Sequence, residues 1–193
     1  DSSTKTVFES KLEILSVKMI SEESILLACP KAIKIVDIGG KIEYLAHPEK
    51  VINMLAIPDA ELIITSCYDN RIRLWCSISF ACVSLLEGHT AMINFMCLIP
   101  NSKLLISSSK DHNLKVWNID TSRCIVSYKI EDNIKLLTLC TKTIVYTTEN
   151  EIKRMDKGNF ISFGNHDLLF LIYMGNDRLF GGSRERKIGR AHV

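Results

Sequence analysis

A repeat of about 40 residues constrains this sequence more than any other feature. Residues 62–76 (LIITSCYDNRIRLWC) align with residues 104–118 (LLISSSKDHNLKVWN), and apolar, hydroxyl, acidic and basic positions coincide. Weaker copies end at Val36-Asp37 and Met155-Asp156, so the positions equivalent to tryptophan are 36, 75, 117 and 155. A period near 40 with four short strands per unit predicts an all-β fold built from the blades of a β-propeller.

The repeat divides residues 1–187 into an incomplete propeller. The predicted blades are residues 11–45, 46–87, 88–130, 131–163 and 164–187, and residues 1–9 fit the outer strand of a preceding blade. Between residues 11 and 25 the apolar pattern also fits a helix, but the repeat register favours strands. The last six residues, 188–193 (IGRAHV), read as the in-frame translation of a common sequencing adapter, so the predicted fold leaves them out.

Composition and charge exclude several classes of function. Of the 193 residues, 24 are basic and 22 acidic. A net charge of +2 does not indicate a surface that binds nucleic acid or a membrane. The apolar runs fall far short of the roughly 18 residues that span a bilayer. The cysteines number seven and lie mostly in apolar runs. We therefore expect free thiols in a reducing, intracellular compartment, either cytoplasmic or nuclear.

No motif for a cofactor, a metal or a small-molecule substrate is found. The nearest cysteines, Cys76 and Cys82, are too far apart for the Cys-x-x-Cys spacing of a zinc site. The Gly-x-x-x-x-Gly-Lys-Ser/Thr phosphate loop is absent from the sequence. We expect no cofactor, no metal and no small-molecule substrate.

The two best copies resemble the WD-repeat (Trp-Asp repeat) β-propeller family, whose unit runs from a Gly-His opener to a closing Trp-Asp. Gly88-His89 and Trp117-Asn118 match these two ends, with Asn118 in place of the usual Asp. In the preceding copy Ala46-His47 and Trp75 take the same positions. The resemblance implies a ring of seven blades, of which this chain would supply four to five.

The resemblance also implies a buried hydrogen-bond relay in each good repeat, from the tryptophan indole through a hydroxyl and an imidazole to an aspartate. The matching residues are His47, Thr65, Asp69 and Trp75, and His89, Ser107, Asp111 and Trp117. A Ser, His and Asp set also suggests a hydrolase triad. A triad needs an exposed nucleophile on a sharp turn, however, and Ser107 lies inside a predicted strand without a Gly-x-Ser-x-Gly setting. We expect a structural relay and no enzymatic activity.

Partner binding is the function that the resemblance implies. In the family, loops on the narrow face of the disc bind partner proteins or peptides. The residues that match those loops are Lys50 and Met92, before the first strands, and Tyr68 and Lys110, just before the turn aspartates. Tyr68 is the best candidate because aromatic side chains anchor interfaces. The same residues also suit ordinary solvated loops.

The sequence therefore predicts a non-enzymatic scaffold for protein assembly, with no nucleic acid or membrane partner. One alternative is a substrate-recruiting subunit of a ubiquitin ligase. The Trp-Asp-x-Arg signature of one such adaptor class is missing, since Cys76 follows Trp75 and Asn118 follows Trp117. A further alternative is an accessory propeller of an enzyme or of an RNA-processing complex.

Overall fold

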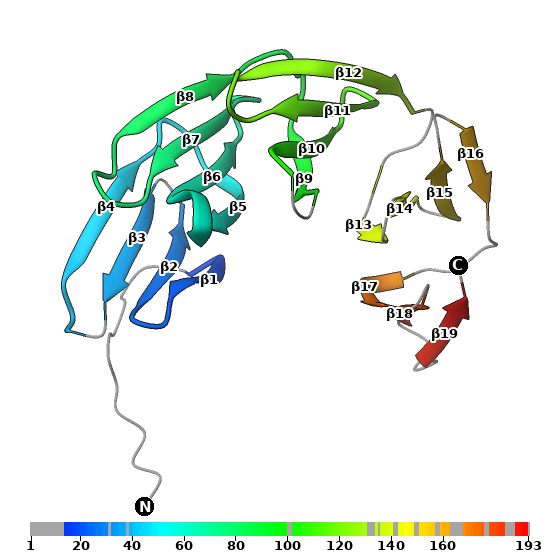
Figure 1. Cartoon of the computed structure of the whole chain (residues 1–193), viewed down its shortest axis with the longest axis horizontal. Coiled ribbons are helices and arrows are strands. Elements are labelled where there is room, and N and C mark those ends of the chain that lie inside the picture. The colour runs from blue at the N-terminus through cyan, green and yellow to red at the C-terminus, as the bar shows by residue number, and fades with distance from the viewer. Residues whose placement is uncertain are drawn as a thin grey trace, which may run out of the picture. The chain divides into compact units, whose positions relative to one another are not determined.

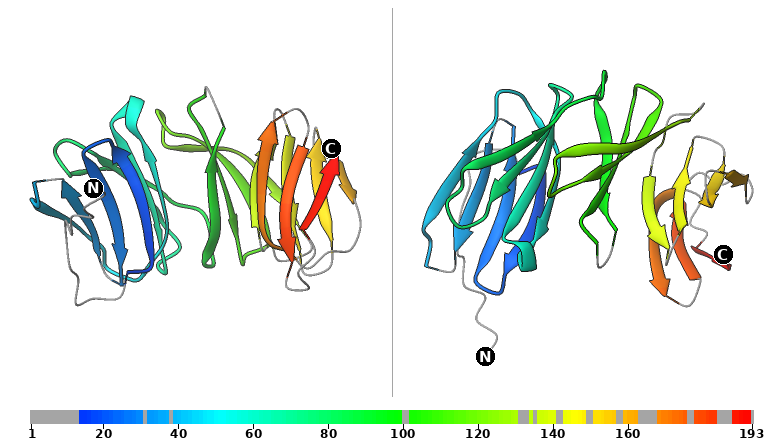
Figure 2. Two further views of the ribbon diagram at one scale, coloured as in Figure 1. Left: turned by 90° about the horizontal axis from the view of Figure 1, so that it is seen from below. Right: turned by 45° about the horizontal axis from the view of Figure 1, so that its top comes forward.

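The computed structural model of the chain consists of antiparallel β-sheets (Figures 1 and 2). It describes residues 14–30, 32–37, 39–99, 102–130, 134, 136–140, 143–148, 151–156, 159–162, 168–175, 178–183 and 188–192. The helix in these ranges is a single 3-10 turn, η1 (Pro58–Ala60). Within the described residues no helix is long and apolar enough to cross a membrane.

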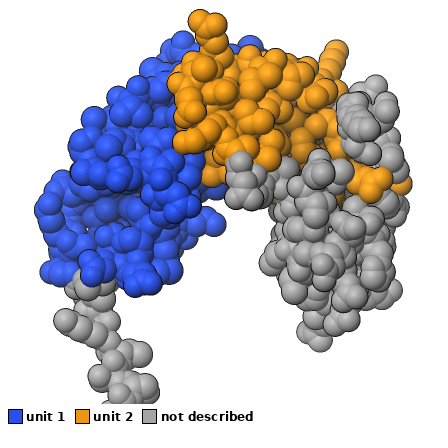
Figure 3. Space-filling model, in the orientation of Figure 1, with its two compact units in different colours: residues 1–93 blue, residues 94–193 orange. Residues whose placement is uncertain are grey.

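The chain divides into two compact units, residues 1–93 and residues 94–193 (Figure 3). The first unit holds two four-stranded sheets, in each of which consecutive strands are neighbours. The first sheet contains β1 (Ser16–Ser21), β2 (Ser24–Cys29), β3 (Ala32–Asp37) and β4 (Ile42–Ala46). The second sheet contains β5 (Val51–Ile57), β6 (Leu62–Cys67), β7 (Ile72–Cys76) and β8 (Cys82–Leu86).

The remaining strands continue the same order. The third sheet contains β9 (Ile93–Leu98), β10 (Leu104–Ser109), β11 (Asn113–Asn118) and β12 (Arg123–Lys129). The fourth contains β13 (Leu136–Cys140), β14 (Thr143–Thr147), β15 (Ile152–Asp156) and β16 (Asn159–Ser162). The fifth is three-stranded and contains β17 (Leu168–Gly175), β18 (Arg178–Ser183) and β19 (Ile188–His192).

The predicted fold class, an all-β protein with four-stranded antiparallel blades, is confirmed. The helical alternative is wrong for the strands β1 and β2 (Ser16–Ser21 and Ser24–Cys29). The outer strand expected at residues 1–9 lies outside the described residues. Residues 188–192, which the predicted fold left out, form β19 and pair with β18. Their origin as an adapter translation stays a prediction, which resequencing of the transcript end would test.

Apolar side chains pack between neighbouring sheets inside each unit. Alternate residues of a strand point to opposite faces, so each sheet presents an apolar face to its neighbour. The cluster in the first unit joins the first and second sheets and comprises Leu26, Ala28, Ile33, Ile35, Leu45, Val51, Met54, Ile63, Cys67 and Trp75. The cluster in the second unit joins the third and fourth sheets and comprises Ile106, Leu114, Val116, Ile130, Ile134, Ile144, Tyr146 and Met155.

Both good repeats share an irregularity at the tryptophan. The register between the third and fourth strands shifts between Leu74 and Trp75, and again between Val116 and Trp117. A β-bulge at this point increases the local twist of the outer strand. The repeat therefore specifies a local backbone distortion as well as a pattern of apolar residues.

Candidate functional site

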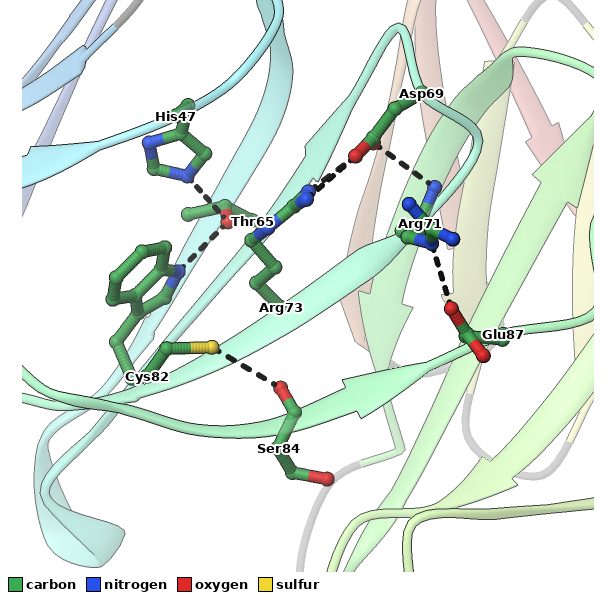
Figure 4. A network of polar contacts seen from close by, with 9 residues as sticks. His47, Thr65, Asp69, Arg71, Arg73, Cys82, Ser84 and Glu87 are labelled. Carbon is green, nitrogen blue, oxygen red and sulfur yellow. Dashed lines mark hydrogen bonds and ion pairs between the residues drawn. The ribbon is translucent and has the colours of Figure 1, made fainter.

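A chain of buried hydrogen bonds runs from the second sheet to the last strand of the first. The Nε1–H group of Trp75 donates to Oγ1 of Thr65 over 2.9 Å. Thr65 Oγ1 lies 2.9 Å from Nε2 of His47, and Nδ1 of His47 lies 2.8 Å from the carbonyl oxygen of Leu45. A carbonyl oxygen only accepts, so Nδ1 carries the hydrogen and Nε2 accepts from the hydroxyl of Thr65. Each side-chain nitrogen and oxygen of the relay therefore has a partner, and Figure 4 shows the contact between His47 and Thr65.

The relay holds His47 in its neutral form. His47 is 6% exposed, and its ring centroid lies 4.9 Å from that of Trp75. Burial lowers the pKa of His47 below its ordinary value of 6.5, because removal from water disfavours the charged imidazolium. The neutral imidazole has one donor and one acceptor nitrogen, and the relay uses both.

The relay ends at Leu45, so the predicted link from the imidazole to Asp69 is wrong for this repeat. Both ring nitrogens of His47 already have partners, and Asp69 instead forms a bidentate pair with Arg73. Nη1 of Arg73 donates to Oδ1 over 3.1 Å, and Nη2 donates to Oδ2 over 2.5 Å. These side chains are 10% (Arg73) and 14% (Asp69) exposed (Figure 4). The planar guanidinium fork matches the two carboxylate oxygens better than it would an imidazole.

The ion pair determines the charge state of Asp69. Burial by itself would raise the pKa of this carboxyl group, but hydrogen bonds from the Arg73 side chain and the Arg71 backbone hold it below its ordinary value of 3.8. The hydrogen bond to Asp69 in turn raises the pKa of Arg73. The sequence prediction overlooked Arg73. Both good repeats have a basic residue four positions after the turn aspartate, and this shared position could have indicated the ion pair.

The next repeat has the beginning of the same relay. Nε1–H of Trp117 donates to Oγ of Ser107 over 2.8 Å, and Ser107 is completely buried. Asp111 accepts the backbone N–H of Asn113 through Oδ1 over 2.9 Å, which closes the hairpin turn. Lys115 stands where the other repeat has Arg73, and it donates to the Ser127 hydroxyl over 3.3 Å.

His89, the fourth residue predicted for this second relay, is 7% exposed. Its predicted bond to Ser107 stays a prediction. The hydroxyls of Thr65 and Ser107 accept indole hydrogens in completely buried positions, so neither is placed to attack a substrate. In the part of the chain that the structure describes, no three His, Cys, Asp or Glu side chains gather closely enough to hold a metal ion.

Two of the four predicted partner-binding residues lie side by side. The backbone N–H of Tyr68 donates to the carbonyl oxygen of Lys50 over 3.0 Å, which joins the β6–β7 turn to the segment before β5. Tyr68 is 52% exposed and Lys50 is exposed. Lys110 is exposed in the β10–β11 turn, whereas Met92 is only half-buried in front of β9.

An exposed ion pair belongs to the same turn as Tyr68. Nε of Arg71 donates to Oε1 of Glu87 over 2.7 Å, and these side chains are 49% and 59% exposed (Figure 4). The sequence prediction did not include this pair. We name the four exposed residues Lys50, Tyr68, Arg71 and Glu87 the turn surface.

The chain matches the family model for the WD domain, G-beta repeat (WD40), at residues 41–76 and 80–118. Two solved structures have a similar fold. The crystal structure of the computationally designed Ika8 protein has a TM-score of 0.79 at 16% identity, over 94% of this chain and 58% of that chain. The crystal structure of the Mitotic Checkpoint Complex has a TM-score of 0.78 at 16% identity, over 93% of this chain and 61% of that chain. No curated protein matches the sequence.

The matched segments are offset from the sheets by one strand. Residues 41–76 contain β4 of the first sheet and β5, β6 and β7 of the second. This offset explains why His47, which directly follows β4, bonds to Thr65 in the next sheet. The chain spans 58% and 61% of the two solved structures, and at 16% identity their likeness concerns the fold alone. The two matched segments, residues 41–76 and 80–118, are therefore identified as WD repeats.

Proposed function

We propose that the chain is a non-enzymatic scaffold and that its turn surface binds a protein or peptide partner. WD40 propellers commonly bind proteins, and they are typically non-enzymatic. One of the two similar structures is itself that of a protein complex. The observation that carries the proposal is the exposed Tyr68 side chain beside Lys50.

The side chain of Tyr68 is available for a partner because the fold uses only its backbone. Its N–H bonds to Lys50, while the side chain is 52% exposed. A tyrosine offers a large apolar ring with a polar tip and loses little conformational entropy on binding, since it has only two side-chain torsions. The exposed pair of Arg71 and Glu87 adds a polar rim, which typically contributes to specificity more than to affinity.

The proposed location is intracellular, in the cytoplasm or the nucleus. The cysteines whose side chains the structure describes are free thiols: Cys29, Cys67, Cys76, Cys82, Cys97 and Cys124. Burial raises the pKa of Cys67 and of Cys97 to about 12, so these two thiols stay protonated and unreactive at neutral pH. Free thiols of this kind suit a reducing compartment.

The test is a quantitative capture of partners by the tagged chain from cells. Tyr68→Ala should lower the recovery of specific partners, by about tenfold where Tyr68 contributes about 1.4 kcal/mol to binding. Lys50→Glu, also on the turn surface, should lower recovery by a smaller factor.

The matched control is Tyr44→Ala, because Tyr44 is an equally exposed tyrosine (57%) on β4, outside the turn surface. This variant should leave partner recovery unchanged. Equal losses with Tyr44→Ala and Tyr68→Ala, or unchanged recovery with Tyr68→Ala and Lys50→Glu, would count against the proposed surface. Far-ultraviolet circular dichroism checks that each variant folds.

A further inference from the structure

The turn that presents Tyr68 is tied to its own sheet by one carboxylate. Oδ1 of Asp69 accepts the backbone N–H of Arg71 over 3.3 Å, inside the turn. The two oxygens of the same carboxylate also accept from the guanidinium group of Arg73, which lies on β7 (Figure 4). Two parallel bonds between a planar guanidinium and a carboxylate fix the orientation of both groups. Asp69 therefore connects the turn to the body of the second sheet.

The backbone bonds of this turn set its path, and the carboxylate adds to them. The N–H of Asn70 donates to the carbonyl oxygen of Cys67 over 3.2 Å, and the N–H of Cys67 donates to that of Arg71 over 3.4 Å. These distances lie at or beyond the long end of the usual range of about 2.7–3.2 Å. Hydrogen bonds to a charged group are stronger than bonds between neutral groups. The bonds of Asp69 should therefore contribute strongly to the order of the turn.

The equivalent turn of the next repeat, between β10 and β11, is held differently. Its Asp111 accepts the backbone N–H of Asn113 over 2.9 Å. Lys115 stands at the position of Arg73, and its Nζ donates to Oγ of Ser127 over 3.3 Å. A lysine has a single ammonium group and no planar fork, so it cannot form the same bidentate contact. Of these two turns, the fork is a feature of the one that presents an exposed tyrosine.

We propose that Asp69 and Arg73 are positioning residues, which hold the β6–β7 turn in the conformation that presents Tyr68 to a partner. The inference rests on the proposed function and adds a cause for the partner's affinity. An ordered turn loses less conformational entropy on binding, so pre-organisation raises affinity without a new contact. The side chains of Arg73 and Asp69 are only 10% and 14% exposed, whereas Tyr68 is 52% exposed. The pair can therefore act through Tyr68 without offering a large contact surface of its own.

Amide hydrogen exchange of the whole chain, followed by mass spectrometry, tests the order of the turn without a partner. Asp69→Asn keeps the side-chain volume but removes the charge that pairs with Arg73. Exchange in peptides that cover residues 67–71 should become roughly tenfold faster, as expected for the loss of a charge-assisted hydrogen bond. Arg73→Lys keeps the charge but loses the fork, so exchange should increase by a smaller factor. Unchanged exchange in both variants would refute the positioning role.

Partner recovery gives the second readout. The probe is the set of proteins that the tagged wild-type chain recovers from cells and that Tyr68→Ala loses. Asp69→Asn should lower the recovery of this set by about threefold to tenfold. The matched control is Ser107→Ala in the third sheet, which removes the acceptor of a buried indole and should destabilise the chain to a similar degree. This control should leave partner recovery, and exchange at residues 67–71, unchanged.

The outcomes separate this inference from the proposed function. If Tyr68→Ala loses no partner, the proposed function fails, and the exchange data alone decide the positioning role. If Tyr68→Ala lowers recovery and Asp69→Asn does not, the positioning role is refuted and the proposed function stands. Equal losses of recovery with Ser107→Ala and Asp69→Asn also refute it, because general destabilisation then explains the loss. If Asp69→Asn does not fold, Arg73→Lys decides by the same two readouts.

Discussion

Two adjacent serines in β10 should respond in opposite ways to the same substitution. Ser107 and Ser108 are 0% and 1% exposed. Ser107 Oγ accepts the indole hydrogen of Trp117, which is itself 1% exposed. Ser108 Oγ is buried and has no hydrogen-bond partner among the described residues. Each alanine substitution removes one oxygen from a buried position of the same strand, and the two hydroxyls differ in their hydrogen bonding.

The expected free energies of unfolding follow from that difference. Ser107→Ala leaves the buried N–H of Trp117 without its acceptor, which should destabilise the chain by about 1–3 kcal/mol. Ser108→Ala removes a buried hydroxyl that lacks a partner, so its effect should lie between zero and a stabilisation of about 1 kcal/mol. Both substitutions remove the same single oxygen from a buried site, so the cavity contributions should be of similar size.

Urea unfolding followed by tryptophan fluorescence measures this difference. With a slope of about 2 kcal/mol per molar urea, the two midpoints should differ by about 1 M. The slopes should agree, because neither substitution changes the surface exposed on unfolding. If Ser108→Ala lowers the midpoint as much as Ser107→Ala, then packing and not the unsatisfied indole determines the effect, and the reasoning is refuted.

Three further predictions concern charge and backbone. Folded His47 has a pKa below the 6.5 of the unfolded chain, so its contribution to stability is complete above about pH 6.5 and is lost as the pH falls through the folded value. Urea midpoints should therefore change less between about pH 7.5 and about pH 5.5 in His47→Gln than in the wild type, and equal changes would contradict this. Asp69→Asn leaves the Arg73 guanidinium without its carboxylate and should cost about 2 kcal/mol at neutral pH. Because the pKa of Asp69 lies below 3.8, the wild type should lose this contribution only as the pH falls below about 4, and an unchanged urea midpoint in the variant at pH 7 would show that the pair contributes nothing. His112 has a positive φ of 60°, as Asn70 has 65° at the same turn position, so His112→Asn should relieve strain of roughly 0.5 kcal/mol and raise the thermal midpoint by about 2 °C; a lower midpoint would contradict this.

The strands and turns of the two best copies could be predicted from the sequence. Their residues repeat most closely at the buried positions, where the fold constrains the side chain most. The alignment of Trp75 with Trp117 predicted a strand, a turn and a strand in each copy, and these are β6 with β7 and β10 with β11. Met155, at the tryptophan position of a weaker copy, is buried in the core of the second unit.

The details of the relay could not be predicted from residue types alone. An imidazole has two nitrogens, and the sequence does not show that the carbonyl oxygen of Leu45 lies 2.8 Å from one of them. The competition between His47 and Arg73 for Asp69 is decided by geometry, since a guanidinium fork bonds both carboxylate oxygens at once.

The polar side chains of the two good repeats therefore serve two separate purposes. Thr65 and Ser107 lie inside strands and satisfy buried indoles. A substitution at these positions leaves a buried hydrogen-bonding group without its partner in an apolar interior. Such positions therefore have little freedom to acquire a binding role. The turn between β6 and β7 is different, because its backbone bonds fix the conformation whichever side chain is present at position 68. Recognition can vary at such a turn without loss of stability. This is the physical reason to seek the partner at Tyr68 rather than at the residues that most clearly mark the repeat.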